Sequence, residues 1–508
     1  MNIVLISTYE LGRQPFGLAS PAAWLRARGH EVACFDLTRE AFQDAAVRDS
    51  ELIAFYVPMH TATRLAAGLV DRVRGLNPRA HLCFYGLYAP VNEEYLRGLG
   101  VATILGGEFE QGLVDLAGRL NETLDQPQSL LFRAERGIPL GSSDGEIPRS
   151  ARNDGPVQQE PVISLARQKF LVPDRAGMPE LANYARVVMP GGEHRIAGST
   201  EATRGCKHLC RHCPIVPVYN GAFRVVDRDV VLDDIRQQVD AGAQHITFGD
   251  PDFFNGPAHS LSIVQALHRE FPVLSYDATI KIEHLRKHDA LLATLRDTGC
   301  LFVISAVESV DDRVLEQFDK GHTRADFLAV VARFRELGMT LLPTFVPFTP
   351  WTSLEGYIDL LDVIAREELC ENVAPIQLAI RLLIPAGSRL LDLPEVRRMV
   401  EPFDSAALVF PWKHQDPRVD ALSKAISDLV QRGDSLKLSR TQIFSHIWRA
   451  AHAAAGITAP PIPGHSAAHP APVPFLDEPW YCCAEPMDNQ FVSIGKASAA
   501  PAKADQYV

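Results

Sequence analysis

Near the middle of the chain, three cysteines fall so close together that one short loop must carry them all: Cys206, Cys210 and Cys213. Basic residues such as Lys207 and Arg211 separate them, so the segment does not suit an apolar core. A loop of this size can wrap one compact metal cluster, and iron–sulfur clusters are held by such thiolates. Three thiolates leave one iron of a 4Fe–4S cluster without a protein ligand, which is the open position that a catalytic metal site needs. The spacing therefore predicts a catalytic 4Fe–4S site.

A zinc site and three incidental thiols are the alternatives to a cluster. Zinc would need a fourth ligand, for which His208 or His212 could serve. Both histidines lie between cysteines, where a short loop would be strained to point four side chains at one ion. We therefore favour the cluster over zinc, and zinc over incidental thiols.

From about residue 195 to residue 389, short apolar runs alternate with amphipathic segments. This alternation predicts six strand–helix units, and hence a partial (β/α)6 barrel of the TIM type with right-handed connections. The predicted strands are residues 195–200, 245–248, 274–280, 301–306, 340–345 and 376–383. Active sites of such barrels lie at the carboxyl ends of the strands, and the cysteine loop directly follows the first strand.

The first 120 residues show the same alternation of strand and helix patterns. The predicted strands are residues 3–6, 31–35, 52–56, 82–85 and 103–105. Their order indicates a doubly wound, Rossmann-like parallel sheet, which binds ligands at the carboxyl ends of its strands. No G-x-G-x-x-G sequence opens a helix in this region, so a nicotinamide or flavin nucleotide site is not predicted.

These patterns predict an α/β protein with five parts. Residues 1–120 form the Rossmann-like domain, 191–393 the barrel and 394–457 a helical C-terminal region. Residues 121–190 lose the periodicity and gain Pro, Gly and Ser, which is typical of a linker. Residues 458–508 combine a Pro- and Ala-rich linker with a tail.

The composition limits the partners of the protein. A net charge of −12 argues against nucleic acid or an anionic membrane surface as the main partner. No run of about 18 apolar residues is present, so a membrane span is not predicted. The N-terminus reads as a first strand, without the charged region and cleavage site of a signal peptide. Nine cysteines, three of them in one loop, fit a reducing cytoplasm better than a disulfide scaffold.

Two acidic segments follow predicted barrel strands. Gly249, Asp250 and Asp252 come after the second strand, in a run whose Gly, Pro and Asn residues indicate a loop. Carboxylates that cap a turn are the equal alternative to a ligand role there. Glu308 and Ser309 leave the fourth strand, which would place a carboxylate at the barrel mouth, where such groups commonly receive ribose hydroxyls. The alternative for Ser309 is a cap of the following helix.

Basic side chains on the third and sixth strands are further candidates. Arg381 could hold a carboxylate in a bidentate fork, or form a buried ion pair with an acid such as Glu308. Asp277, Thr279 and Lys281 share one face of the third strand. An isolated buried ammonium is costly, so Lys281 needs a partner, and we expect a structural salt bridge more readily than a substrate contact.

The tail carries a second group of thiols, Cys482 and Cys483, directly after an aromatic segment. Adjacent cysteines bridge each other only with strain, which makes such a disulfide reactive. They can instead bind a soft metal or metalloid, ligate an auxiliary cluster or accept electrons. Incidental thiols in an ordinary tail are the alternative.

The C-x3-C-x2-C loop after a strand resembles the signature of radical S-adenosylmethionine (radical SAM) enzymes. The resemblance implies that the unligated iron binds SAM, and that electron transfer cleaves a carbon–sulfur bond to give a 5′-deoxyadenosyl radical. It also implies an electron donor such as flavodoxin or ferredoxin. The loop of Gly249, Asp250 and Asp252 resembles the family segment that receives the SAM amino group, and Glu308 matches the fourth-strand motif.

The N-terminal domain resembles the cobalamin-binding domain that precedes many radical SAM domains, and residues 106–110 resemble the last-strand motif of that group. The D-x-H-x-x-G motif, whose histidine ligates cobalt, is absent, because the first histidine of the chain is His30. A domain with only a packing role is therefore at least an equal alternative, and the expectation leans against cobalamin.

The sequence Cys-Cys-Ala-Glu-Pro at residues 482–486, together with the cysteine loop, resembles the CUAEP/CCAEP-tail radical SAM proteins over nearly the full length. In that group selenocysteine can stand in place of Cys483, which implies redox or soft-atom chemistry there. Another tailed group, with an RCCLKC tail, is associated with arsenic-containing natural products.

The leading hypothesis is a radical SAM enzyme in which Cys482 and Cys483 assist a reaction on an unknown small molecule. Three alternatives stay open. The chain could be a cobalamin-dependent radical methyltransferase, or an enzyme whose dithiol binds a metalloid such as arsenic for carbon–metalloid bond formation. It could also be a metal or metalloid carrier or sensor without turnover.

Overall fold

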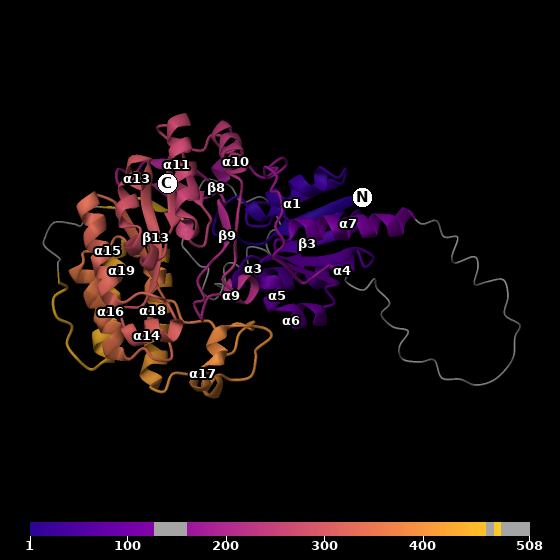
Figure 1. Ribbon diagram of the computed structural model, residues 1–508. Helices are drawn as coiled ribbons and strands as arrows, with labels where there is room; N and C mark the ends of the chain where they lie inside the picture. Colours follow the sequence, from indigo (N-terminus) through magenta and orange to yellow (C-terminus); the bar gives the residue numbers. More distant parts are fainter. Residues whose placement is uncertain (126–159, 464–471, 479–508) are drawn as a thin grey trace, which may run out of the picture.

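The computed structural model describes residues 1–125, 160–463 and 472–478. Within these ranges the chain builds two large β-sheets, each covered by helices, which lie beside one another (Figure 1), and one two-stranded sheet. Cys482 and Cys483 lie outside the described residues. No helix of the described part is both long and apolar enough to cross a membrane.

The N-terminal sheet has six parallel strands in the order β2-β1-β3-β4-β5-β6. Their bounds are Asn2–Ser7 (β1), Glu31–Asp36 (β2), Leu52–Tyr56 (β3), His81–Tyr85 (β4), Thr103–Gly107 (β5) and Ile163–Ser164 (β6). Strands β3 and β5 are buried along their whole length, as apolar runs in a parallel sheet require. The predicted doubly wound sheet is confirmed.

Helices cover both faces of this sheet. They are α1 (Phe16–Arg26), α2 (Asp44–Arg48), α3 (His60–Ala67), α4 (Val70–Leu76), α5 (Tyr88–Val91), α6 (Glu93–Gly98) and α7 (Glu110–Asp125). Helices α1 and α7 pack against each other on one face, over side chains such as Leu5 and Leu105. Helices α3 to α6 contribute to the core on the other face.

The second sheet has seven strands in the order β14-β13-β12-β11-β8-β7-β15. Five are parallel: β8 (His194–Thr200), β11 (His245–Phe248), β12 (Ser275–Thr279), β13 (Cys300–Glu308) and β14 (Thr340–Phe345). The short strands β7 (Arg186–Val188) and β15 (Phe475–Leu476) add antiparallel at one edge. The sheet is a curled half-barrel, so a partial barrel is confirmed.

Seven helices alternate with the parallel strands of the half-barrel. They are α10 (Arg228–Asp240), α11 (Pro257–Glu270), α12 (Ile282–Lys287), α13 (Leu292–Asp297), α14 (Asp312–Phe318), α15 (Arg324–Leu337) and α16 (Leu354–Arg366). Most of them pack on the sheet through one continuous apolar core, while α14 packs into the core of the N-terminal domain. This strand–helix alternation agrees with the sequence pattern.

The prediction of a sixth strand at residues 376–383 is wrong. Residues Pro375–Leu378 form a 3-10 helix (η5), and only one bridge, between Phe348 and Arg381, continues the sheet beyond β14. Pro375 cannot donate a backbone hydrogen bond, and the side chain of Gln377 accepts one from the Phe345 amide (3.1 Å). A side chain thus takes the position of a strand partner, and the barrel stays open beyond β14.

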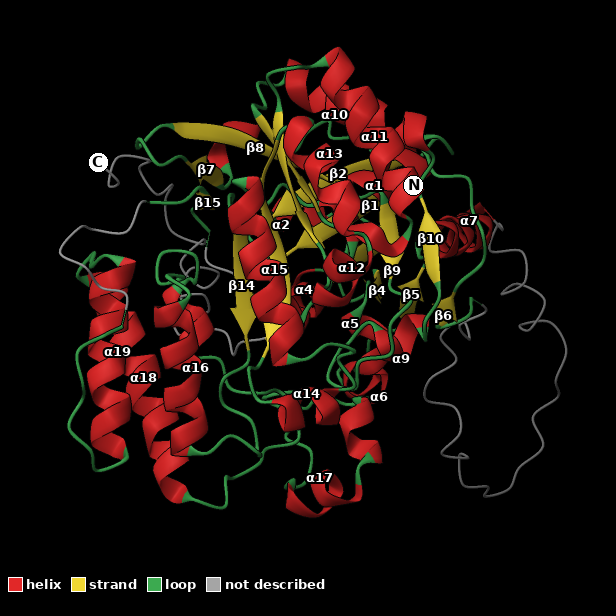
Figure 2. Cartoon of the chain, turned by 60° about the vertical axis from the view of Figure 1, so that its left-hand side comes forward, coloured by secondary structure: helices red, strands yellow, loops and turns green. Residues whose placement is uncertain are grey.

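Three helices follow the half-barrel in the chain. They are α17 (Pro394–Met399), α18 (Pro417–Ser435) and α19 (Arg440–Ala454), and α16, α18 and α19 lie side by side (Figure 2). Helices α18 and α19 pack into the apolar core of the half-barrel. The predicted helical C-terminal region is confirmed. Beyond α19 the described chain returns to the sheet edge as β15.

Part of the predicted linker joins the two sheets. The segment after residue 160 contributes β6 to the first sheet and β7 to the second. Arg175 lies between them, and its guanidinium binds the Asp234 carboxylate of α10 (Nε–Oδ1 2.9 Å) and the Gln14 side chain (2.8 Å). Residues 160–190 therefore pack across both domains rather than serving as a plain spacer.

Candidate functional site

The candidate site lies at the carboxyl ends of the barrel strands. The cysteine loop follows β8, the loop of Asp250 and Asp252 follows β11, and Glu308 is the last residue of β13. Because β8 and β11 are parallel neighbours, with Thr200 opposite Phe248, their loops leave the sheet side by side. A hairpin of β9 (Thr203–Gly205) and β10 (Phe223–Val225) carries the start of the cysteine loop.

The three thiols of the loop are free, and Cys206 and Cys210 are buried while Cys213 is half-buried. Burial raises the pKa of Cys206 to about 11, and it raises the pKa of Cys213 further. The ammonium groups of Lys281 and Lys320 face these thiols and act in the opposite direction. Buried neutral thiols become thiolates when they coordinate metal ions, so this set of donors fits an iron–sulfur cluster.

Two side chains of the neighbouring loop hold the cysteine loop in place. Both carboxylate oxygens of Asp250 are used, one accepting from the Ala202 amide (2.9 Å) and one from the Thr203 hydroxyl (2.6 Å). Burial raises the pKa of Asp250 to about 7. Asn255 accepts from the Lys207 amide (3.3 Å) and donates to the Gly205 carbonyl (3.1 Å). Asp250 therefore acts on the cysteine loop itself, whereas the sequence pointed to a ligand or a turn.

Asp252 connects the second loop to two histidines. It caps the 3-10 helix Phe253–Asn255 by accepting from the Phe254 amide (3.1 Å). Its other oxygen lies 2.5 Å from Nδ1 of His284 and 3.4 Å from Nε2 of His208. Burial alone would raise the pKa of Asp252, but these two histidines outweigh it and lower the pKa to about 2.

The zinc alternative has one structural feature in its favour. One ligand atom from each of Cys206, His208 and Asp252 lies within 4.8 Å of the others. A cluster and a zinc ion would compete for Cys206, so iron and zinc analysis separates the two readings. The sequence did not suggest Asp252 as a zinc ligand, because Cys206 and His208 are distant from it along the chain.

Glu308 is the centre of a buried charged group. Its carboxylate accepts from the Lys320 ammonium (2.9 Å) and lies 3.1 Å from Nε2 of His212. Burial would raise the pKa of Glu308, but Lys320 and His212 lower it well below its usual range. The backbone of Glu308 has φ +68°, which is unfavourable for a residue with a Cβ and is typical of functional sites.

Sequence reasoning missed Lys320 and His212 as partners of Glu308. Lys320 follows α14, which ends at Asp319 in the left-handed conformation (φ 53°), and this turn brings the ammonium back to the end of β13. Nδ1 of His212 is buried and has no hydrogen-bond partner among the described residues. A polar ligand beside Glu308 would supply one, which fits the binding of SAM there.

Ser309 and Arg381 have other roles than the sequence suggested. The Ser309 hydroxyl accepts from the Asp311 amide (3.0 Å), and it is Asp311 that caps α14. The Arg381 guanidinium stacks over the Trp412 ring at 3.6 Å and binds the Asp420 carboxylate (2.7 Å). Of the two roles considered for Arg381, a hold on a carboxylate ligand and an ion pair with an acid, the described residues show the ion pair, with Asp420 in place of Glu308.

Lys281 has the structural salt bridge that its sequence position required. Its ammonium lies 3.4 Å from the Glu283 carboxylate. Lys281 itself lies beyond the end of β12, at the start of α12, whereas Asp277 of β12 binds His245 (2.8 Å) and the Thr247 hydroxyl (2.6 Å) of β11. These contacts lie inside the half-barrel and tie two strands together.

The N-terminal domain holds the cysteine loop from the other side. Arg204, two residues before Cys206, is buried against three carboxylates: Glu110 (2.6 Å), Glu201 (2.8 Å) and Glu108 (3.4 Å). Glu108 and Glu110 lie directly after β5, so the carboxyl end of β5 meets the first loop of the barrel. One buried arginine facing three acids leaves excess negative charge, and burial raises the pKa of Glu108 to about 7.

The sequence left open whether the N-terminal domain binds a corrinoid. The space between the two sheets shows how much room such a ligand would have. Ligands of a doubly wound sheet bind at the carboxyl ends of its strands. Here the Arg204 guanidinium lies against the rings of Phe16 and Phe109 (5.4 Å to each centroid), and the cavity that Arg204, Tyr56 and Phe109 line measures about 190 Å³. Ordinary small-molecule sites measure roughly 300–1,000 Å³, and a corrinoid is larger than most such ligands. A corrinoid at this place would therefore require these side chains to move.

The fold and this site together define the class of the barrel. Residues 200–361 match the family model "Radical SAM superfamily". The match spans the cysteine loop, the Asp250 loop, Glu308 and Lys320, so this part of the chain is similar to the radical SAM superfamily. Enzymes of this superfamily use a 4Fe–4S cluster and SAM, which agrees with the free thiols and with the polar group around Glu308.

Two curated proteins are similar to this chain in sequence, at low identity. The chain is 23% identical over 347 residues to hopanoid C-3 methylase of Methylococcus capsulatus, covering 66% of this chain and 62% of that protein. It is 26% identical over 221 residues to tRNA-2-methylthio-N(6)-dimethylallyladenosine synthase of Moorella thermoacetica, covering 41% of this chain and 47% of that protein. The chain thus spans less than two thirds of these relatives.

Two solved structures share the fold over most of the chain. The cobalamin-dependent radical SAM enzyme OxsB with aqua-cobalamin bound superposes with a TM-score of 0.64 at 14% identity, covering 88% of this chain and 71% of that one. The radical SAM methyltransferase TsrM of Kitasatospora setae, with tryptophan and a SAM analogue bound, gives 0.54 at 18% identity and 72% coverage of each chain. At these identities the likeness shows the fold alone.

Proposed function

We propose that the chain is a radical SAM enzyme that acts on a small-molecule substrate. The observation that carries the proposal is the convergence of three free thiols and the buried Glu308 group at the carboxyl ends of the barrel strands. Cys206, Cys210 and Cys213 would hold the 4Fe–4S cluster. When bound, the cluster and SAM supply reductive cleavage of a carbon–sulfur bond and a 5′-deoxyadenosyl radical.

The protein groups around the thiols bind and orient SAM in this proposal. Glu308 accepts from the ribose hydroxyls, and the Lys320 ammonium, now paired with Glu308, binds the SAM carboxylate. The buried Nδ1 of His212 gains a polar partner from the ligand. Gly249 lies beside the Thr200 carbonyl and leaves room for the SAM amino group near Asp250 and Asp252.

Reconstitution tests this cluster assignment. Protein reconstituted anaerobically with iron and sulfide is expected to bind about four irons and four sulfides per chain, with broad visible absorption. The variant with all three loop cysteines changed to Ala should bind none, and Cys370→Ala, which removes a buried thiol elsewhere, should bind as much as the unmodified protein. Stoichiometric zinc in place of iron would contradict the proposal.

We further propose that Cys482 and Cys483 act at the same end of the barrel. The last described residue of the tail, Glu478, accepts from the Tyr9 hydroxyl (3.2 Å) and packs on Gly12, whose neighbour Arg13 lies beside Gly249. The two cysteines follow four and five positions later, a covalent reach of roughly 13–18 Å at 3.3–3.6 Å per residue. This anchoring supports the tail as a holder of a substrate atom, a metalloid or electrons.

Replacement of the tail thiols tests that role. Cys482→Ala/Cys483→Ala is expected to cleave SAM at the normal rate but to yield no modified product from metabolite extracts of the host. Asn489→Ala, in the same tail, is the control and should leave the product unchanged. Equal product from the double cysteine variant would reject a role for the thiols.

Corrinoid binding separates this proposal from a cobalamin-dependent methyltransferase. Two proteins with similar folds are described with cobalamin or as cobalamin-dependent, but the cavity beside Arg204 here measures only about 190 Å³. Anaerobic protein mixed with hydroxocobalamin and then desalted is expected to keep no corrinoid absorption. Retention of one corrinoid per chain would favour the methyltransferase instead.

A further inference from the structure

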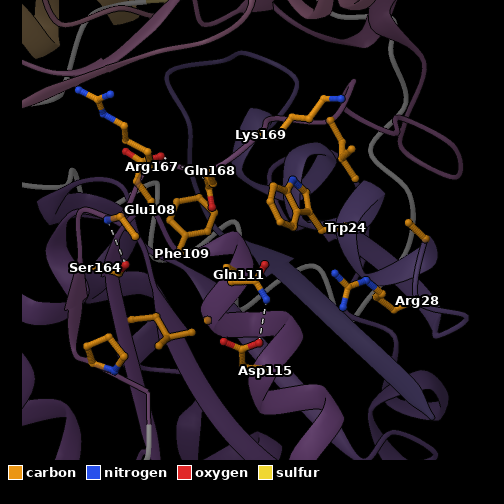
Figure 3. A pocket seen from close by; sticks show the side chains of 17 residues that line it. Trp24, Arg28, Glu108, Phe109, Gln111, Asp115, Ser164, Arg167, Gln168 and Lys169 are labelled. Carbon is orange, nitrogen blue, oxygen red and sulfur yellow. Dashed lines mark hydrogen bonds between the residues drawn. The ribbon is translucent and has the colours of Figure 1, made fainter.

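A second hollow lies on the N-terminal domain, away from the Glu308 group. Helices α1 and α7, the end of β5 and the segment 161–171 enclose a cavity of about 690 Å³ (Figure 3). Gly106 of β5 and Gly112 of α7 are among the residues that line it. This volume is within the roughly 300–1,000 Å³ of small-molecule sites and suits a ligand of nucleotide size.

The cavity contains a buried donor that the described residues do not satisfy. Trp24 is 8% exposed, and its indole N–H has no hydrogen-bond partner among the described residues. Buried donors in native proteins are nearly always paired, because an unpaired one loses its hydrogen bond to water without replacement. Trp24 is therefore built to donate to an atom that the described chain does not provide.

Cations border the same cavity. In Figure 3 Lys169 of the covering segment lies above the Trp24 ring and Arg28, which follows α1, lies below it, and Arg167 adds a third charge on the wall. None of the three has an ion-pair partner among the residues that the structure describes, and all are exposed. On a chain with a net charge of −12, three unpaired cations around one hollow favour an anionic ligand.

The rest of the wall suits a nucleoside. Leu105, Phe109 and Leu171 supply apolar surface, as base-binding sites require. Asp115, which accepts from the Gln111 side chain (2.7 Å), keeps a second oxygen for a hydroxyl, and carboxylates are common partners of ribose hydroxyls.

We propose that this cavity binds a nucleoside phosphate. Arg28 and Lys169 hold the phosphate, Asp115 a ribose hydroxyl and the Trp24 N–H an acceptor of the base or phosphate. The site is separate from the SAM site, and nothing in it depends on the cluster.

The proposed site connects to the cysteine loop through one side chain. Gln168, on the cavity wall, donates to Glu110 (2.8 Å) and to Glu108 (3.3 Å), which hold Arg204 two residues before Cys206. A ligand that orders the covering segment therefore acts on the anchor of the cluster loop. The link makes the cavity a place from which a nucleotide can regulate the enzyme.

Calorimetric titration of the full chain with ADP tests the proposal, with adenosine and pyrophosphate as separate probes. ADP is expected to bind once per chain, and more tightly than either probe alone. Lys169→Ala and Arg28→Ala should each weaken ADP binding at least 10-fold. The matched control Lys424→Ala, at an exposed lysine of α18, should bind ADP normally.

A second variant removes only the buried donor. Trp24→Phe keeps the apolar bulk and should weaken ADP binding several-fold, with circular dichroism confirming that the domain is folded. Three results would overturn the proposal: no ADP binding, equal binding of adenosine and ADP, or ADP binding that Arg28 and Lys169 variants leave unchanged. The last would assign the nucleotide to the SAM site, and all three can be read on protein without a cluster.

Discussion

Glu308 shows most directly how single residues define the site. It combines burial, a left-handed backbone and two basic partners. This arrangement costs free energy, and such costs are typically kept where a ligand or a reaction requires them. A glutamate kept only for packing would not need this backbone conformation. The same residue illustrates the limit of sequence reasoning, since a strand-end acid can be recognised locally but its partners cannot.

A double-mutant cycle tests the Glu308–Lys320 pair. Lys320→Met leaves a buried carboxylate without its ammonium, and we expect it to lower the free energy of unfolding by about 3–5 kcal/mol. Adding Glu308→Gln should recover more than half of that loss, because no uncompensated charge remains. Urea unfolding of the cluster-free protein measures both, and Lys287→Met, on the surface of α12, should stay within about 0.5 kcal/mol of the unmodified protein. Additive losses in the double variant would show that the pair is not coupled.

Asp252 predicts a pH dependence of stability. Its pKa of about 2 in the folded protein is below the roughly 3.9 of an unfolded chain. A lowered carboxyl pKa contributes stability that is fully present above about pH 4 and is lost as the pH falls toward 2. Asp252→Asn should therefore lower the free energy of unfolding by about 2 kcal/mol at pH 7 and flatten the acid branch of the stability curve.

The measurement is thermal or urea unfolding of cluster-free protein between pH 2.5 and pH 7. Asp416→Asn is the control. The pKa of Asp416 is also lowered, but its carboxylate pairs with Arg418 at the surface, where solvent screens the interaction, so the acid branch of the stability curve should change little. An acid branch that is unchanged in Asp252→Asn would contradict the role of the two histidines.

At the scale of elements, the sequence pattern predicted both sheets because apolar strands and amphipathic helices leave strong local signals. It failed at residues 376–383, where the apolar run of a strand is present but Pro375 starts a 3-10 helix. It also missed what holds the cysteine loop, since Asp250, Asn255 and Arg204 act through residues that are distant in the chain. Such contacts depend on packing and leave no periodic signal.

Arg204 provides the test at this scale. Arg204→Met leaves Glu108, Glu110 and Glu201 buried without a cation, so we expect a loss of about 3–5 kcal/mol in the free energy of unfolding. Because Arg204 anchors the cysteine loop, the iron bound after reconstitution should fall too. Arg204→Lys keeps the positive charge but loses the forked guanidinium, so it should recover only part of the stability and part of the bound iron. Normal stability and iron content in Arg204→Met would contradict the anchoring role.

At the scale of the whole molecule, the chain places its first sheet against the mouth of its barrel. The start of α7 meets the loop after β8 through Glu110 and Arg204, the segment 160–190 meets α10 through Arg175 and Asp234, and the end of the described tail meets Tyr9 of the N-terminal domain. The sequence predicted the three thiols, the acid of β13 and the region around Asp250. It could not predict that Arg204 is buried against Glu108 and Glu110 of the N-terminal domain, since this follows from how the domains pack.

The measurement that tests the central claim most directly is the fate of SAM. Anaerobically reconstituted protein, given dithionite and SAM, is expected to release 5′-deoxyadenosine, and the variant without the three loop cysteines should release none. Mass spectrometry of the quenched reaction measures both. If reconstituted protein with a full cluster leaves SAM intact, or if the cysteine-free variant cleaves it equally, the assignment of Cys206, Cys210 and Cys213 to radical SAM chemistry is contradicted.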